Sequence, residues 1–90
     1  MDDSNNYTFI NGIATVQVAT GAGTLVRIVL TETAAGAISI SDNTAGTTQD
    51  IGIMKASIAE NSYPYGVKFT KGLRIGTAGA SKLTVVWSQP

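Results

Sequence analysis

Short runs of alternating apolar and polar residues recur along the chain, and most of them end at glycine, asparagine or aspartate. The clearest run covers residues 24–31. In it, Val26, Ile28 and Leu30 share one face, and Arg27 lies on the other. A repeat of two residues, together with the β-branched side chains, favours a strand over a helix. We therefore expect a β-protein in which this run is a central strand.

The beginning of the chain predicts a hairpin. Residues 7–10 (Tyr-Thr-Phe-Ile) form an apolar run that stops at Asn11-Gly12, and residues 13–20 alternate again. An Asn-Gly dipeptide between β-formers is the strongest short-range hairpin signal in a sequence. We therefore expect these two runs to pair with each other.

The alternation changes phase between residues 51 and 58. Ile51 and Ile53 share one parity, whereas Met54 and Ile58 have the opposite one. Such a switch indicates a bulge or a crossing between two sheets. Residues 54–60 fit either a strand, which we favour, or a short helical turn.

Three further runs lie between Tyr63 and Trp87, separated by Lys71-Gly72 and by a turn at residues 77–80. They predict a three-stranded meander, with Gly72 available for a positive φ in a tight turn. Tyr63 precedes a proline, so we expect it in an extended entry to the first of these strands, with its ring exposed.

These elements predict an all-β fold, a single small antiparallel β-sandwich of seven to eight short strands, jelly-roll-like or a partly open barrel. We expect residues 1–6 to form an N-terminal arm and residues 7–90 to form the sandwich. The predicted core is apolar and lies on the inward parity of each run: Val16, Val18, Val26, Ile28, Leu30, Ile38, Ile40, Ile53, Val67, Phe69, Leu73, Ile75, Leu83, Val85 and Trp87.

The composition predicts a surface whose side chains lose little conformational entropy when they are immobilised in a contact. Charged residues make up 13% of the 90 residues, about half the share in an average soluble domain. Small residues replace them, and these lose little side-chain entropy in a contact. There is no cysteine and no histidine, which excludes disulfides and argues against zinc. Domains this small often gain stability from disulfides, metals or oligomerisation, and association with other chains is the stabiliser that stays open here.

Candidate chemistry is sparse, and we expect neither an enzyme nor a cofactor. Without histidine the commonest general base is missing, and no glycine motif for phosphate occurs. Asp42, Asn43 and Asp50 carry oxygen ligands, but their spacing lacks the pattern of a calcium loop, so turn chemistry is favoured. The start, Met1-Asp2, lacks a signal-peptide pattern, and no apolar run is long enough for a membrane.

Two binding functions stay open at this point. Lys68, Lys71, Arg74 and Lys82 lie near aromatic residues, as in sheets that hold single-stranded nucleic acid. The parity of Tyr65 and its neighbours favours a core role, however, and the net charge is zero, so nucleic acid is not the favoured partner. Exposed tyrosines could instead form a platform for a glycan.

Residues 40–46 (Ile-Ser-Asp-Asn-Thr-Ala-Gly), 65–75 (Tyr-Gly-Val-Lys-Phe-Thr-Lys-Gly-Leu-Arg-Ile) and 83–87 (Leu-Thr-Val-Val-Trp) carry a resemblance. Together they resemble small structural proteins of tailed bacteriophages, over about residues 24–88. The resemblance implies a capsid cement or decoration protein, made in the host bacterial cytoplasm and located on the capsid surface of the virion. Such proteins bind the major capsid protein and copies of themselves, often as trimers.

The resemblance leaves alternatives: a tail, fibre or head–tail module of the virion, or a free module that binds glycan or nucleic acid. For the favoured capsid role, we expect the contacts in the arm and in exposed aromatic residues. The interface residues we nominate are Asp2, Asp3, Tyr7, Phe9 and Tyr63.

Overall fold

The chain folds into eight β-strands in a computed structural model that describes residues 6–46 and 48–89. The described part contains no helix. The strands are β1 (Asn6–Asn11), β2 (Ala14–Thr20), β3 (Gly23–Glu32), β4 (Ile38–Ser41), β5 (Gly52–Met54), β6 (Ser62–Phe69), β7 (Gly72–Thr77) and β8 (Lys82–Ser88). The predicted all-β class and the number of short strands are confirmed.

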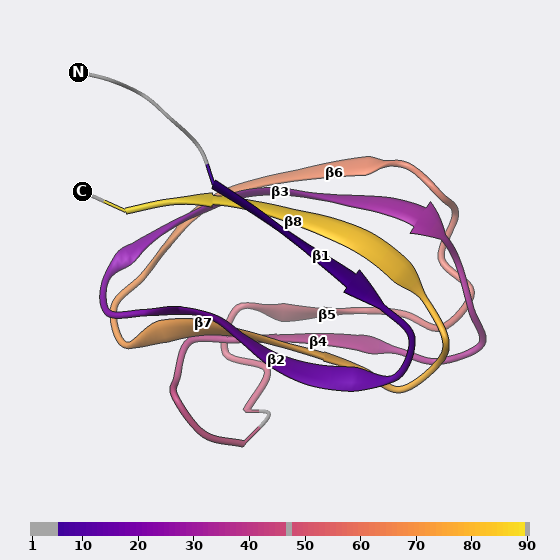
Figure 1. The fold of residues 1–90 in the computed structure, drawn as a ribbon, viewed down its shortest axis with the longest axis horizontal. Helices are drawn as coiled ribbons and strands as arrows, with labels where there is room; N and C mark the ends of the chain where they lie inside the picture. The colour runs from indigo at the N-terminus through magenta and orange to yellow at the C-terminus, as the bar shows by residue number, and fades with distance from the viewer. Residues whose placement is uncertain (1–5, 47, 90) are drawn as a thin grey trace.

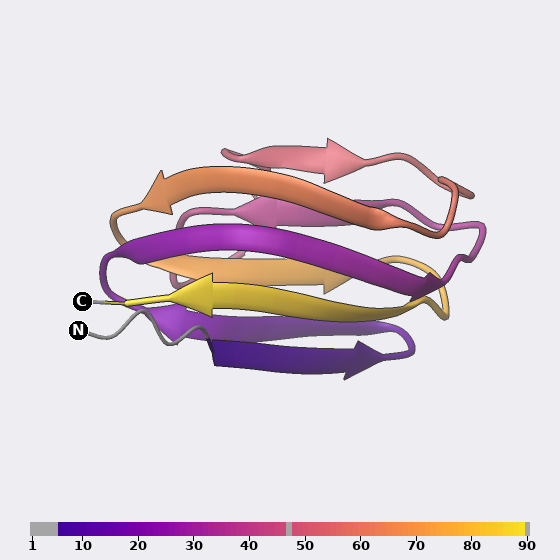
Figure 2. The same ribbon diagram turned by 90° about the horizontal axis from the view of Figure 1, so that it is seen from above.

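The strands form two four-stranded antiparallel sheets that pack face to face (Figures 1 and 2). Sheet I has the order β1-β8-β3-β6, and sheet II has the order β2-β7-β4-β5. All neighbours that the register describes are antiparallel. Only the connection from β4 to β5 stays within one sheet, and every other connection carries the chain to the opposite sheet. This is the topology of a jelly roll. The sandwich prediction is therefore confirmed.

The predicted hairpin at Asn11-Gly12 is wrong. β1 pairs with β8, and β2 pairs with β7. Gly12 has a positive φ of 94°, and its N–H donates to the carbonyl of Ser81 at 2.9 Å. The turn carries the chain from sheet I to sheet II. The dipeptide specified a tight reversal correctly. It did not specify the pairing, because burial of both apolar sheet faces requires the two strands to lie in opposite layers.

The predicted meander after Tyr63 is also wrong. β6 and β8 share sheet I but are separated by β3, and β7 lies in sheet II. Gly72 does not have a positive φ. It is glycine for a different reason: a Cβ there would lie 2.8 Å from the Ala19 carbonyl oxygen and 2.9 Å from that of Asn43. The absence of a side chain lets three backbone segments meet at this point.

Two bulges explain the errors at Val18 and Val26 in the predicted core. Leu25 lies opposite Trp87 but Arg27 lies opposite Val86, so Val26 is an extra residue in β3. Alternation therefore restarts there, and Leu25 is fully buried whereas Val26 is half-buried. A similar register shift in β2 leaves Val18 unpaired and buries Ala19. An apolar residue at the bulge continues the sequence pattern, so the pattern does not reveal the shift.

The segment after β5 is a crossing between the sheets. β5 ends at Met54, which is buried, and Ile53 is 53% exposed, so the prediction of Ile53 as a core residue is wrong. The favoured strand over residues 54–60 is wrong as well, since the chain turns there with Ser57 at a φ of 57°. The predicted crossing between sheets is confirmed, because β5 lies in sheet II and β6 in sheet I.

The core lies between the sheets. Nine predicted members are buried: Ile28, Leu30, Ile38, Ile40, Phe69, Leu73, Ile75, Leu83 and Val85. Val16, Val18 and Trp87 are only partly buried at its margin, and Val67 is 36% exposed, contrary to the prediction. Ile10 from β1 is an additional member. Each fully buried aliphatic side chain contributes about 1.5–3 kcal/mol relative to its exposed state.

Candidate interaction surface

The outward residues of β1 are aromatic. Ile10 lies opposite Leu83 on the inner face of sheet I, so alternation turns Tyr7 and Phe9 to the outer face. Tyr7 is 75% exposed and Phe9 is 52% exposed. A tyrosine and a phenylalanine at this exposure leave a large apolar area in water, which makes the outer face of β1 a candidate contact surface.

The exposed apolar surface continues across sheet I. Tyr7 lies opposite Val86, which in turn lies opposite Arg27. The next row runs from Phe9 to Val29 through Thr84. We call this surface the outer patch. It comprises Tyr7, Phe9, Arg27, Val29, Pro64 and Val86.

The outer patch contains one cation. Arg27 is held in place by a hydrogen bond from its Nη1 to the Ser62 hydroxyl, at 3.1 Å. At the end of the sheet, Lys82 and Glu32 form an ion pair with an N–O distance of 3.5 Å, with both side chains about half exposed. Such an exposed pair contributes little to stability. The patch therefore suits an apolar partner with a hydrogen-bond acceptor or a carboxylate above Arg27.

The structure brings together two of the nominated interface residues and separates the others. Tyr7 and Phe9 lie on the same face of the same strand. Tyr63 lies opposite Ile28 on the inner side of β6, half-buried against the core, and its hydroxyl donates to the Ala59 carbonyl. Asp2 and Asp3, and most of the predicted arm at residues 1–6, lie outside the described residues.

The expected exposure of the Tyr63 ring is wrong because of the position of Pro64. The proline lies inside β6 rather than at an entry to it. An edge strand tolerates proline, since a missing N–H on its free side breaks no ladder hydrogen bond. Tyr65 is also half-buried; burial, and then the neighbouring Tyr63, raise the pKa of its hydroxyl.

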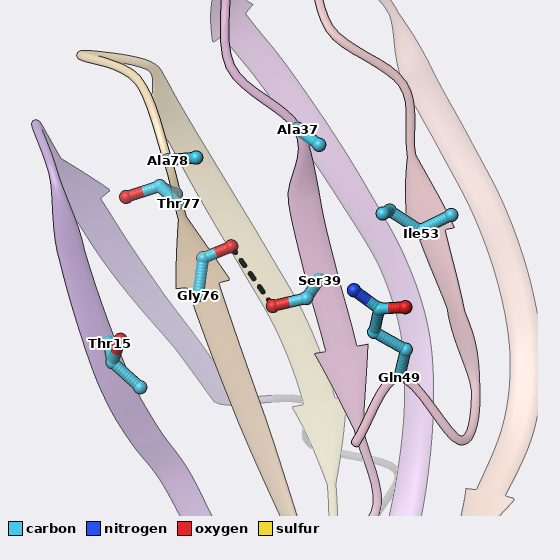
Figure 3. Close-up of a pocket in the computed structure, with 8 residues that line it drawn as sticks. All are labelled: Thr15, Ala37, Ser39, Gln49, Ile53, Gly76, Thr77 and Ala78. Atoms are coloured by element: carbon cyan, nitrogen blue, oxygen red, sulfur yellow. Dashed lines mark hydrogen bonds between the residues drawn. The ribbon is translucent and has the colours of Figure 1, made fainter. Parts of the chain in front are cut away.

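The outer face of sheet II has a depression, whereas bulky side chains project from the outer face of sheet I. Thr15, Gly76, Ser39 and Ile53 lie side by side across its four strands. The small residues among them leave a shallow pocket of about 290 Å³ (Figure 3). Its lining consists of Thr15, Ala37, Ser39, Gln49, Ile53, Gly76, Thr77 and Ala78. No local pattern predicts this pocket, because strands far apart in the chain contribute to it.

The pocket contains hydroxyl and amide groups but no charged lining residue. The Ser39 hydroxyl donates to the Gly76 carbonyl over a long 3.4 Å. Gln49 reaches the rim from the loop after β4, with a φ of 58° and its N–H donating to the Ser41 hydroxyl at 2.9 Å. The arrangement can hold a small neutral polar group, and it offers no nucleophile paired with a base.

The loop after β4 is fixed to the molecule by Asp42. Its carboxylate accepts hydrogen bonds from the backbone N–H groups of Thr70, Lys71 and Gly72, at 2.8–3.3 Å, and from the Thr70 hydroxyl. Partial burial raises the pKa of Asp42, but these hydrogen bonds outweigh it and hold the pKa below its ordinary value. The carboxylate that we considered as a calcium ligand thus caps the turn between β6 and β7.

A polar network covers the rest of the outer face of sheet II. The Gln17 amide donates to the carbonyls of Ala19 and Asn43, at 2.8 and 2.9 Å, and its Oε1 accepts from Arg74 at 2.9 Å. Within the described residues, Arg74 Nε and Asn43 Oδ1 are buried and have no protein partner. This network is structural, because most of its bonds end on the backbone of neighbouring segments.

The basic residues near the aromatic ones do not share a surface. Lys68 and Lys82 belong to sheet I, Lys71 lies in the turn after β6, and Arg74 belongs to the network on sheet II. Phe69, the expected neighbour of these cations, is 1% exposed. A stacking platform for single-stranded nucleic acid requires exposed aromatic rings beside the cations. Tyr7 and Phe9 have no such neighbours other than Arg27 in the described part of the outer patch.

No helix in the described part of the chain is long and apolar enough to cross a membrane. The same residues contain no group of three or more acidic, histidine or cysteine side chains placed to hold a metal ion. Comparison with protein-family models, with curated proteins and with solved structures gave no match to this chain.

Proposed function

We propose that this chain is a non-enzymatic structural protein of a phage virion, a capsid cement or decoration protein whose outer patch contacts the major capsid protein. The observation that carries the proposal is the exposed aromatic pair Tyr7 and Phe9 on a small, charge-poor jelly roll. Jelly rolls serve in viral capsids and also in lectins, so the fold alone is only an analogy. The resemblance to phage structural proteins directs the choice between them.

The physical properties of the outer patch fit such a role. Its residues project from strands rather than from loops, so they lose little conformational freedom on binding. One patch of this size gives a weak contact. Many identical sites on one shell turn weak contacts into high avidity when the protein is itself oligomeric.

A second candidate function rests on the pocket of sheet II. Its hydroxyl and amide lining and neutral character suit a sugar residue, and the Ile53 side chain forms an apolar wall. At about 290 Å³, the pocket lies just below the range of roughly 300–1,000 Å³ for ligand sites. It also lacks an aromatic platform, so the glycan function ranks second.

Binding to capsids tests the proposal. Purified protein is mixed with shells assembled from a major capsid protein of the same genome, and bound protein is measured by sedimentation. We expect the double variant Tyr7→Ser/Phe9→Ser to lose most of the binding. Ile53→Ser, which removes an equally exposed apolar side chain from the opposite face, is the matched control and keeps it.

The possible outcomes separate the alternatives. Equal binding by both variants, or no binding by the unmodified chain, contradicts the capsid proposal. Gold-labelled protein seen at the tail or at a single vertex by electron microscopy supports the tail or head–tail alternative. A glycan array that responds to the unmodified chain but not to Ile53→Ser supports the second candidate.

A further inference from the structure

The two sheets have four edges, and three of them are protected against pairing with another chain. β6 carries Pro64, Lys68 and a bulge at Gly66, where φ is 62°. β2 contains a register shift beside Val18, and β5 has only three residues. Proline, lysine, bulges and short length are the features by which proteins block edge pairing.

β1 has none of these features. Its six residues are Asn-Tyr-Thr-Phe-Ile-Asn, without charge, proline, glycine or bulge. Among residues 6–46 and 48–89, they pair regularly with β8 and with no strand on the other side. In Figure 2 the strand (indigo) lies along one margin of the molecule. An uncharged, regular edge with exposed aromatic side chains is a template for a further strand.

We propose that β1 pairs antiparallel with β1 of a second copy of this chain, which joins the two copies of sheet I into one eight-stranded sheet. This inference concerns the chain in solution and does not depend on the proposed capsid function. It names a different surface: the backbone edge of β1, beside the outer patch.

The sequence of β1 is self-complementary in one register. In antiparallel pairs, opposite residues share a face, so the two-fold axis must pass midway between one residue and the same residue of the second copy. An axis at Thr8, between the two copies of this residue, places Tyr7 opposite the partner's Phe9 and Thr8 opposite the partner's Thr8. Aromatic pairs and threonine pairs are both favourable across strands. An axis at Phe9 instead places Tyr7 opposite the partner's Asn11, so the Tyr7 ring of each copy has no aromatic residue opposite it.

The register has a consequence for the surface. Tyr7 and Phe9 of both copies lie on the same outer face, so the two outer patches become one continuous surface with four aromatic rings across the seam. The contact is isologous and closes at two copies, so it does not propagate into a fibre.

The contact is also small. One strand pair buries less than the ~1,200 Å² of a standard stable interface, so we expect a dissociation constant between about 1 µM and 1 mM. Analytical ultracentrifugation from about 10 µM to 1 mM protein then gives a reversible monomer–dimer equilibrium. A chain that stays monomeric throughout this range overturns the proposal.

Charge variants test the contact through the outward residues of β1. Tyr7→Lys/Phe9→Lys and Tyr7→Glu/Phe9→Glu place like charges opposite each other, and each alone should weaken association at least tenfold. An equal mixture of the two should restore dimers, now mixed ones. These positions are exposed, so the fold is retained, which circular dichroism verifies. Failure of the mixture to associate contradicts the pairing of β1 with itself.

Disulfide trapping tests the register, and the absence of native cysteine makes the result unambiguous. Opposite residues have Cβ atoms roughly 4.5–5.5 Å apart, within reach of a disulfide after small adjustments. Oxidation of a mixture of Tyr7→Cys and Phe9→Cys chains should give the mixed dimer, and neither variant alone should cross-link efficiently.

Thr15→Cys, on the protected edge of sheet II, measures random collisions. Efficient cross-linking by Phe9→Cys alone would place the axis at Phe9 and overturn the proposed register. Cross-linking of all variants at the rate of Thr15→Cys would overturn the contact itself. Because these measurements use no capsid, they test the pairing of β1 independently of the proposed function.

Discussion

The outer faces of the two sheets differ in shape and in chemistry. That of sheet I presents bulky apolar side chains, led by Tyr7 and Phe9, to solvent. That of sheet II is lined by small residues such as Ser39 and Gly76, and the chain's own loop after β4 is bonded to it through Gln17. The difference shows that the second face is partly covered by the protein's own loop, whereas within the described residues the first keeps bulky apolar side chains in solvent. Substitutions in the polar network of sheet II should therefore lower the free energy of unfolding, and substitutions in the outer patch of sheet I should weaken association with other chains.

The largest expected effect is that of Gln17→Ala. It leaves the carbonyls of Ala19 and Asn43 and the guanidinium of Arg74 without their hydrogen-bond partner. Partly buried groups left unsatisfied cost about 1–3 kcal/mol, so we expect a loss near the upper value, measured by urea unfolding. Thr15→Ala, on the same strand and face but exposed, is the control and should change stability by less than ~0.5 kcal/mol. Equal losses of unfolding free energy in the two variants would contradict a structural role of the network.

The next effect concerns Asp42. Asp42→Asn replaces a carboxylate that accepts from three backbone N–H groups, and we expect a loss of about 1–2 kcal/mol near neutral pH. Because the pKa of Asp42 is lowered in the folded state, its contribution is fully present above the ordinary aspartate pKa. It is lost as the pH falls through the lower folded value.

The measurement is urea unfolding of the unmodified chain and of Asp42→Asn between about pH 7 and pH 2. The difference between them should be largest near neutral pH and should shrink below about pH 4. A difference that stays constant over this range would show that the carboxylate charge is not what fixes the loop.

The smallest effect on stability is expected on sheet I. Tyr7→Ser/Phe9→Ser changes only exposed side chains, so the free energy of unfolding should change by less than ~0.5 kcal/mol at a protein concentration where the chain is monomeric. At a concentration where it is dimeric, the unmodified chain should unfold at a higher temperature than the variant, by mass action. A large loss of stability at low concentration would show that these rings support the fold instead of a contact.

Local patterns predicted much of the fold. The alternation in residues 24–31 and 83–87 placed Ile28, Leu83 and Val85 in the core, because one buried face per sheet imposes a period of two. The alternation failed where an extra residue was inserted. At Val26 the bulge changes the phase without changing the apolar character, so no local signal marks it.

The candidate surface was predicted in part. Tyr7 and Phe9 were nominated from the sequence, and the structure places both on the outer face of β1. The pocket on sheet II was not predicted, since Thr15, Ser39 and Gly76 become neighbours only through pairing across the sheet. Tyr63 was assigned to the surface because Pro64 suggested an entry turn. An edge strand accepts that proline, and the ring turns inward.

By itself, the sequence determined the class of the fold, the number of strands and the absence of histidine and cysteine chemistry, because these depend on residue type and local period. Only the tertiary structure decided which strands pair. Turns such as Asn11-Gly12 reverse the chain in either topology, and the choice follows from burying two apolar sheet faces against each other. That choice also leaves β1 at an edge, and β1 carries both the aromatic residues of the outer patch and the backbone edge proposed for pairing.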